Sequence, residues 1–434
     1  MNAIISVAIF AVAYFFIATE KINKTIVAVL GASLVLLLRL ITFEQASKAV
    51  DLNVIFLLVG MMTAVAILAR TGFFEWSAIS VAKLARGNPM AIMLLLLTLT
   101  AIISAFLDNV TCVVLLVPVT ILISQILEIS PVPFVILEAI SSNVGGTATL
   151  IGDPPNVIIG SQGGLTFNDF IINLTPCIVV VFIVFALTSM LIFRKQLSIP
   201  GHIKKRINEA IPHLAIVDKP NMIRSLIVLG LMILGFILHA VLHLEPGIIA
   251  LCGSMILMMV CKTESNDALL QVEWGVIFFF IGLFIMVAAI EHSGAIAWVA
   301  KYLLLVGGGN LLVMCIVILW GGALLSSALD NIPLVIAMVP LLKASFVPIA
   351  QNLGITDPAI IHTTIVEPLW WSLSLGVCLG GNGTLIGASA NVVSARICEK
   401  NKYHLSFLMF TKYGFLLMIQ SLIICTVYIW LRYF

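Results

Sequence analysis

Two Asp-Asn pairs interrupt long apolar segments of the chain: Asp108-Asn109 and Asp330-Asn331. They lie midway along the intervals 90–125 and 312–346, which are too long for one membrane helix and suit two half-helices meeting at a turn. Asp and Asn are common at turns and helix N-caps. A carboxylate inside a membrane costs ~3 kcal/mol or more on insertion scales. We therefore expect Asp108 and Asp330 to carry protons or ions, and the alternative is that each only caps its half-helix.

A second polar, glycine-rich motif follows each pair: SSNVGGTATLIGDPPN at 141–156 and SLGVCLGGNGTLIGASAN at 374–391. Gly-Gly allows unwound backbone, and Pro154-Pro155 removes two amide donors, so a continuous helix is not expected. The motifs predict two broken helices whose carbonyls, hydroxyls and amides surround a small solute or ion. The predicted solute-binding residues are Asn109, Asn331, Asn143, Gly145, Gly146, Thr147, Thr149, Asn156, Gly381, Asn382, Thr384 and Asn391.

The two broken-helix motifs differ at one point. Asp153-Pro154-Pro155 in the first corresponds to Ala388-Ser389-Ala390 in the second. Asp153 is predicted either to carry a proton or to cap the second half-helix. Glu138, near the start of the first broken helix, is expected at the membrane interface. The sequence contains no metal-ligand spacing and no cofactor motif, and we interpret its eight cysteines as small packing residues.

The motifs recur because the chain contains an internal duplication. At an offset of 222 residues, Val54-Ile55-Phe56 falls on Val276-Ile277-Phe278 and the first Asp-Asn pair falls on the second. Farther along the offset becomes 235, and Thr149-Leu150-Ile151-Gly152 falls on Thr384-Leu385-Ile386-Gly387. Internal repeats with matching interrupted segments are typical of secondary transporters. We expect a first repeat over 1–195, a basic linker over 196–222 and a second repeat over 223–434.

The composition requires a membrane around these repeats. The chain has 434 residues, 62% of them hydrophobic and 10% charged, which is far from the composition of a soluble globular protein. Nucleic acid binding is not expected, because the sequence shows no basic helix or aromatic-basic patch. Residues 1–19 lack a basic start and are expected to be a retained first span rather than a signal peptide. The clear spans are predicted at 3–19, 25–41, 52–69, 170–193, 223–242, 247–261, 274–291 and 407–431.

The distribution of basic residues predicts the orientation of the chain. If each half has five crossings and one re-entrant hairpin, 17 of the 22 Lys and Arg residues lie on the cytoplasmic side. A sixth crossing per half would make the repeats parallel and spoil this asymmetry. We therefore predict an all-α, polytopic protein of the cell (inner) membrane. It has about ten transmembrane helices plus two re-entrant hairpins with broken helices, inverted halves, and both termini outside.

At these motifs the sequence resembles the ArsB/NhaD permeases of the ion-transporter superfamily. The resemblance rests on SSNVGGTATLIGDPPNVIIG, SAFLDN and SSALDN, and the first string also looks like the dicarboxylate/sodium symporters and the P protein. It implies a scaffold domain and a mobile transport domain, an elevator-type motion and a homodimer. The hairpin tips of the dicarboxylate symporters read Ser-Asn-Thr. Here Asp108 and Asp330 replace the Ser, which argues against a carboxylate substrate because two acids would repel it.

Three transport functions fit these features. The first is proton-coupled efflux of arsenite or antimonite, in which the uncharged trihydroxide binds the predicted Asn and Thr side chains. The second is Na⁺/H⁺ antiport, with Asp108, Asp330 and Asp153 binding the exchanged cations. The third is anion or dicarboxylate transport. An enzyme is not expected, because HExxH, GxSxG and P-loop motifs are absent. The expected partners are the bilayer, the solute with protons or Na⁺, and a possible separate ATPase subunit.

Overall fold

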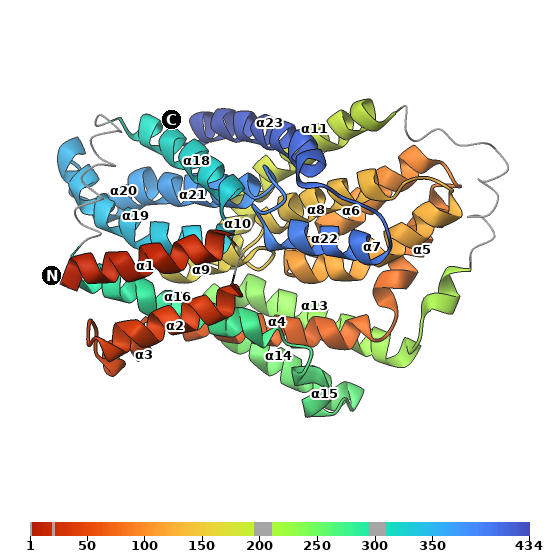
Figure 1. Cartoon of the computed structure of the whole chain (residues 1–434), viewed down its shortest axis with the longest axis horizontal. Helices are drawn as coiled ribbons and strands as arrows, with labels where there is room; N and C mark the ends of the chain where they lie inside the picture. Colours follow the sequence, from red (N-terminus) through yellow and green to blue (C-terminus); the bar gives the residue numbers. More distant parts are fainter. Residues whose placement is uncertain (1, 20–21, 195–210, 295–309) are drawn as a thin grey trace.

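The computed structural model describes residues 2–19, 22–194, 211–294 and 310–434, and within these ranges the secondary structure is helical without strands (Figure 1). Eight of the described helices are long and apolar enough to cross a membrane. These are α4 (Leu52–Ala69), α7 (Asn109–Ile126), α11 (Thr175–Phe193), α13 (Lys219–Leu242), α16 (Trp274–His292), α18 (Leu311–Ala328), α19 (Asn331–Leu353) and α23 (Phe407–Tyr433). Further apolar helices are α1 (Asn2–Thr19), α2 (Lys24–Leu37), α6 (Pro89–Ser104) and α14 (Pro246–Cys261). The predicted all-α, polytopic fold class is confirmed.

The other described elements are shorter or less apolar. They are α3 (Phe43–Ala49), α5 (Phe73–Leu84), α8 (Val132–Thr147), α9 (Pro154–Gly163), α10 (Phe167–Asn173), α15 (Ser265–Leu269), α20 (Pro358–Ile361), α21 (Glu367–Gly380), α22 (Ser389–Lys400) and the turns η1 (Pro212–Ala215) and η2 (His362–Val366). The span predicted over 170–193 is split between α10 and α11, because Pro176 in the first turn of α11 cannot continue the preceding helix. Of the predicted linker over 196–222, residues 196–210 lie outside the described residues.

Both intervals that carry an Asp-Asn pair form helical hairpins. The first hairpin consists of α6 and α7, and the second consists of α18 and α19. In each hairpin the Asp is the N-cap of the second helix: Asp108 accepts hydrogen bonds from the backbone of Val110 and Thr111, and Asp330 accepts one from Ile332. The Asn that follows each Asp is then the first residue of its helix.

Both glycine-rich motifs interrupt helices as predicted. α8 ends at Thr147 and α9 begins at Pro154, while α21 ends before Gly381 and α22 begins at Ser389. Two glycines let these broken helices approach the hairpins closely. A Cβ on Gly145 would lie 2.2 Å from the carbonyl oxygen of Ala101 in α6, and one on Gly380 would lie 2.5 Å from the Cα of Ala323 in α18. Each broken helix is therefore packed, backbone against backbone, on the hairpin of its own half.

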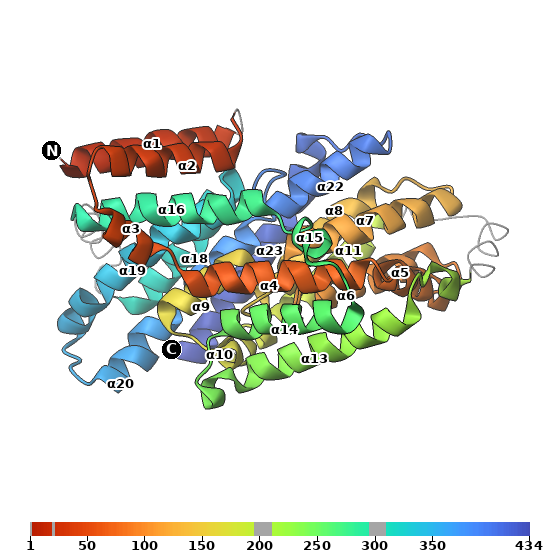
Figure 2. The same ribbon diagram turned by 90° about the horizontal axis from the view of Figure 1, so that it is seen from below.

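The helices form two groups. In the scaffold group, α2 packs on α16 and α4 packs on α14, with α1 and α13 beside them (Figures 1 and 2). The hairpin group contains the two hairpins, the two broken helices, α11 and α23. Within it α7 packs on α22 and α19 packs on α9, so each hairpin also touches the broken helix of the other half.

The equivalent helices of the two halves run in opposite directions. In Figure 2, α1 runs from the left toward the middle and α13 runs from right to left, and the pairs α2 with α14 and α4 with α16 are likewise opposed. As a result, the α1–α2 turn lies at the right-hand end of α1 and α2 in Figure 2, whereas the α13–α14 turn lies at the left-hand end of α13 and α14. This arrangement, together with the exchanged packing of α2 on α16 and α14 on α4, is that of an inverted repeat.

Candidate functional site

A cavity of about 290 Å³, here called cavity 1, lies between the scaffold group and the hairpin group. Five helices begin at its wall, and their first residues line it: Lys24 of α2, Asn109 of α7, Pro154 of α9, Asn331 of α19 and Ser389 of α22. The amino end of a helix carries unpaired backbone N–H groups and the positive end of the helix dipole. The side chains of Asn23, Asp108 and Asp330 cap α2, α7 and α19, and the two prolines that begin α9 have no N–H group. Among these five helices, α22 therefore has the uncapped amino end.

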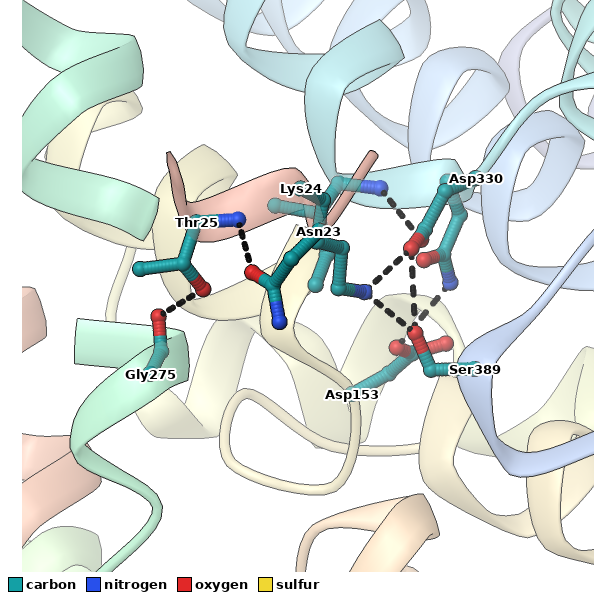
Figure 3. Close-up of polar contacts among 9 residues, drawn as sticks. Asn23, Lys24, Thr25, Asp153, Gly275, Asp330 and Ser389 are labelled. Carbon is teal, nitrogen blue, oxygen red and sulfur yellow. Dashed lines mark hydrogen bonds and ion pairs between the residues drawn. The ribbon is translucent and has the colours of Figure 1, made fainter. Parts of the chain in front are cut away.

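Asp330 of the second hairpin pairs with Lys24 of the scaffold group. The Lys24 Nζ lies 2.7 Å from Asp330 Oδ2 and 2.8 Å from Ser389 Oγ, and Ser389 Oγ donates to the same carboxylate oxygen at 3.0 Å (Figure 3). The Lys24 ammonium also lies 5.2 Å from the centre of the Phe279 ring. The predicted ion-binding acid Asp330 is thus neutralised by a cation that is 306 positions away in the sequence.

Asp108, the equivalent acid of the first hairpin, has no cationic partner among the described residues. Its Oδ2 accepts hydrogen bonds from the backbone N–H and the hydroxyl of Thr111, at 3.0 and 2.7 Å, and its Oδ1 accepts one from the Val110 N–H. Both oxygens are therefore used in capping α7. The two acids occupy equivalent positions in the repeat but have different surroundings.

Asp153 lies between the two hairpins and is fully buried. Its Oδ1 accepts hydrogen bonds from the side-chain amides of Asn109 and Asn331, both at 3.3 Å. Although Asp153 stands at the N-cap position of α9, its side chain makes no capping hydrogen bond. Its Oδ2 has no hydrogen-bond partner within the described part of the chain. Of its two predicted roles, capping is therefore not seen, and proton carriage stays a prediction.

A network of side-chain amides connects the two halves behind Asp153. The Asn109 amide also donates to Asn143 Oδ1 at 3.1 Å, and the Asn143 amide donates to Asn382 at 2.9 Å and to Asn391 at 3.1 Å. All these asparagines are buried. Because Asn143 belongs to the first half and its two acceptors belong to the second, movement of one broken helix relative to the other would break buried hydrogen bonds.

The remaining predicted solute-binding residues support the backbone and do not line cavity 1. The amides of Asn156 and Asn391 donate to carbonyls within their own helix breaks. The hydroxyls of Thr149 and Thr384 donate to carbonyls of the hairpin tips, and Thr147 donates to the Asn143 carbonyl. Only two members of the predicted set line the cavity, Asn109 and Asn331. The residues behind the cavity are Asn143, Gly145, Gly146, Thr147, Thr149, Asn156, Gly381, Asn382, Thr384 and Asn391.

The expected interfacial position of Glu138 is wrong. Glu138 lies inside the protein with 1% of its surface exposed, and Thr120 of the first hairpin donates a hydrogen bond of 2.6 Å to its Oε1. The expectation of an interfacial position followed from the place of Glu138 near the start of α8. Because α8 packs against other helices, among them α6, α7 and α21, this side chain lies inside the protein. Glu138 joins the broken helix of the first half to the hairpin of the same half.

Sequence reasoning missed three charged residues of cavity 1: Lys24, Glu273 and Arg396. Each stands near the end of a helix, where a charged side chain is ordinarily interfacial. The signal that could have revealed Lys24 is a departure from the repeat. Lys24 corresponds at the offset of 222 residues to Pro246, so the lysine belongs to one half only.

A second cavity, cavity 2, has a volume of about 360 Å³ and occupies the repeat-equivalent place. Its lining includes Leu244, Glu245 and Pro246, which correspond to Ile22, Asn23 and Lys24 of cavity 1. It also includes Val157 and Ser161, which correspond at the offset of 235 to Val392 and Arg396. Neither Asp-Asn pair lines cavity 2. The hairpin tips are therefore open to the cavity at the α1–α2 turn and closed to the one at the α13–α14 turn.

Comparisons with known proteins show the family of the chain. The profile of the CitMHS family, described as citrate transporters, matches residues 14–376. This chain belongs to the CitMHS family. An uncharacterized transporter of Mycobacterium tuberculosis is 40% identical over 436 residues, covering 100% of this chain and 99% of the relative. A 46 kDa membrane protein of Mycobacterium leprae is 39% identical, with 99% of each chain covered.

Two further relatives extend the comparison. The human P protein is 32% identical over 506 residues, which cover 98% of this chain and 59% of that protein. The structure of the YdaH transporter of Alcanivorax borkumensis is similar with a TM-score of 0.52 at 14% identity, covering 90% of this chain and 87% of that one, and shows a shared fold. The chain is accordingly a multi-pass membrane transporter of the CitMHS family. The narrower ArsB/NhaD assignment is not shown by these relatives.

Proposed function

We propose that this chain is a cation-coupled secondary transporter that carries a small anion of the carboxylate class through cavity 1. The observation that supports this most directly is the presence of Lys24 and Arg396 in the wall of cavity 1, beside the uncapped N-terminus of α22. Backbone N–H groups at helix N-termini are ready-made anion sites. The description of the family as citrate transporters supports the same class of solute.

The acids of the hairpin tips, Asp108 and Asp330, should repel an anion less strongly than the sequence alone suggested. Asp330 is paired with Lys24, and both oxygens of Asp108 accept hydrogen bonds from the first turn of α7. The repulsion expected of two unpaired carboxylates is therefore reduced. In this proposal Asn109 and Asn331 contact the anion, whereas Asp108, Asp330 and Asp153 handle the coupled cation.

Uptake into proteoliposomes tests the proposal. Purified protein is reconstituted, and accumulation of radiolabelled citrate and succinate is measured under an imposed pH gradient or an imposed Na⁺ gradient. We expect one of these gradients to drive at least tenfold accumulation, which Asn331→Ala reduces and the exposed variant Lys48→Met leaves unchanged. The absence of carboxylate uptake under both gradients, in protein that exchanges another solute, would contradict the carboxylate assignment.

Arsenite transport is the second candidate, because the facing amides of Asn109 and Asn331 would also suit an uncharged polyhydroxide. The same vesicles are tested with arsenite under a pH gradient, and a trapped pH-sensitive dye reports Na⁺/H⁺ exchange without solute. Movement of arsenite but not of carboxylates would favour the arsenite/antimonite permease, and dye response to Na⁺ alone would favour the antiporter. The homodimer and the separate ATPase subunit stay predictions of the resemblance.

A further inference from the structure

Lys24 is a cation of the scaffold group bound to an acid of the hairpin group. The side chains of Lys24 and Asp330 are 32% and 14% exposed, so water screens this ion pair less than a surface pair. It connects α2 to the tip of the second hairpin and, through Ser389, to the start of α22. Any movement of the hairpin group along the scaffold group must therefore separate the two charges.

The repeat shows that this ion pair has no counterpart. The equivalents of Lys24 and Ser389 are Pro246 and Pro154, neither of which carries a charge or a side-chain hydrogen-bond donor. If the hairpin group moved so that Asp108 approached the α13–α14 turn as Asp330 now approaches the α1–α2 turn, Asp108 would meet Pro246. Asp330 thus has an internal cation on one side only.

We propose that Lys24 is an internal cation that competes with the coupled cation for Asp330. When the hairpin group leaves Lys24, Asp330 must bind a proton or Na⁺, since an unpaired carboxylate inside the protein is strongly unfavourable. When the hairpin group returns, the Lys24 ammonium binds Asp330 Oδ2 in place of the coupled cation. The coupled cation is then released from Asp330 into the water of cavity 1. This inference deepens the proposed function, because it names the residue that couples movement of the cation to movement of the anion.

Other titratable groups surround this pair from the neighbouring elements. They are Tyr14 of α1, Glu273 before α16, Asp108 of the first hairpin, Asp153 before α9 and Arg396 of α22. None of them is ion-paired with Asp330 among the described residues, where Lys24 alone has that contact. Lys24 is accordingly the cation whose removal should change the competition at Asp330.

A cross-link that needs no solute tests the competition. Ile22 before α2 and Ile332 of the second hairpin both line cavity 1. The pair Ile22→Cys with Ile332→Cys is introduced with Cys252→Ser, which removes the exposed cysteine and leaves the seven buried ones. The yield with a short bismaleimide is measured in detergent at varied pH and, separately, at varied Na⁺. Each yield is divided by the maleimide labelling of the single-cysteine variants under the same conditions, because only the thiolate reacts. We expect the yield to fall at least fivefold as the concentration of the coupled cation is raised. A response to pH identifies the proton as this cation, and a response to Na⁺ identifies Na⁺.

Variants of Lys24 decide the role of the lysine. Lys24→Met should reduce the cation-dependent change in yield to less than twofold and abolish cation-driven accumulation of citrate, whereas Lys24→Arg should preserve both. The double variant Lys24→Met with Asp330→Asn removes both charges, which protects folding, and should also be insensitive to cations. Lys48→Met, which breaks an exposed pair with Glu44, is the matched control and should behave as the parent protein.

The outcomes separate this inference from the proposed function. If the cross-link yield of Lys24→Met keeps its full dependence on the cation, the competition at Asp330 is disproved. If Lys24→Met does not fold, the same outcome in the double variant with Asp330→Asn disproves it. If the parent protein moves no citrate but its cross-link responds to the cation only when Lys24 is present, the solute class is wrong and the role of Lys24 stands.

Discussion

Asp153 has no acidic counterpart in the second repeat, although it is bound by equivalent residues of both hairpins. Its Oδ1 receives the amides of Asn109 and Asn331, which are equivalent residues of the two hairpins. A group bound equally by both halves lies where the halves meet, and only one residue can fill that place. The second half has buried Ala388 at the corresponding position, and an acid there would bring a second carboxylate toward the same centre. The loss of symmetry at Asp153 is therefore a consequence of its central position.

Substitution of Asp153 separates its charge from its hydrogen bonds. Asp153→Asn keeps an oxygen for the two amides and should fold, but it cannot carry a proton, so we expect cation-driven uptake of citrate to fall at least tenfold. Asp153→Ala leaves the buried Asn331 amide without its acceptor, at about 1–3 kcal/mol, and removes one of the two acceptors of the Asn109 amide, so it should lower the thermal unfolding midpoint in detergent. Asp357→Asn, at an exposed N-cap, is the control. Normal uptake by Asp153→Asn would make Asp153 only a hydrogen-bond acceptor.

Glu138 provides a second test at the scale of single residues. Thr120 is its one hydrogen-bond donor among the described residues, because Oε2 has no partner there. Thr120→Val should therefore destabilise the protein by about 1–3 kcal/mol, and the double variant Thr120→Val with Glu138→Leu should recover part of this loss. The measurement is the thermal unfolding midpoint in detergent, with Thr98→Val, whose hydroxyl bonds only its own helix, as the control. Equal midpoints for Thr120→Val and the control would contradict the importance of this contact.

At the scale of elements, the sequence predicted the interruptions better than the contacts. Asp108, Asp330, Gly-Gly and Pro154-Pro155 act on their own backbone, so their types and spacing predicted the hairpins and helix breaks. The ion pair of Lys24 joins residues 306 positions apart, and no local property of either residue contains that information. The same holds for Glu138, because the packing of α8 against helices far away in the sequence decides its burial. Local signals therefore predicted the elements of the site, and tertiary packing determined which polar groups face cavity 1.

Glycine substitutions test the close packing of broken helix on hairpin. Gly145→Ala and Gly380→Ala should each destabilise the protein, typically by about 1–3 kcal/mol, because the new methyl group meets the backbone of Ala101 or Ala323, which cannot rotate away. Gly321→Ala in α18 is a matched control, since its Cβ would meet no atom within 4 Å. Thermal unfolding in detergent measures all three. If Gly145→Ala and Gly380→Ala are as stable as Gly321→Ala, the close approach does not constrain these helices.

At the scale of the whole molecule, the two cavities occupy repeat-equivalent places but differ in their contact with the hairpin tips. Cavity 1 reaches both hairpin tips, whereas cavity 2 is lined by the equivalent scaffold residues and by α9 but by neither Asp-Asn pair. Because the halves are inverted, exchanging their conformations would open cavity 2 to the tips and close cavity 1. The walls would not be equivalent, since Lys24 and Arg396 of cavity 1 correspond to Pro246 and Ser161 of cavity 2. In the proposed transport of an anion, this difference in charge at two positions would favour binding on one side and release on the other.

The exchange predicts a contact that is absent from this conformation. Leu244 and Val110 are the repeat equivalents of Ile22 and Ile332, but they line different cavities. We expect a Leu244→Cys, Val110→Cys pair to cross-link only in the alternate state, so that its yield rises under the conditions that lower the yield of the Ile22→Cys, Ile332→Cys pair. Both pairs are assayed with the same reagent in the Cys252→Ser background. A transport-competent Leu244→Cys, Val110→Cys protein that never cross-links would mean that the tips do not reach cavity 2, and the solute would then have to leave by another route.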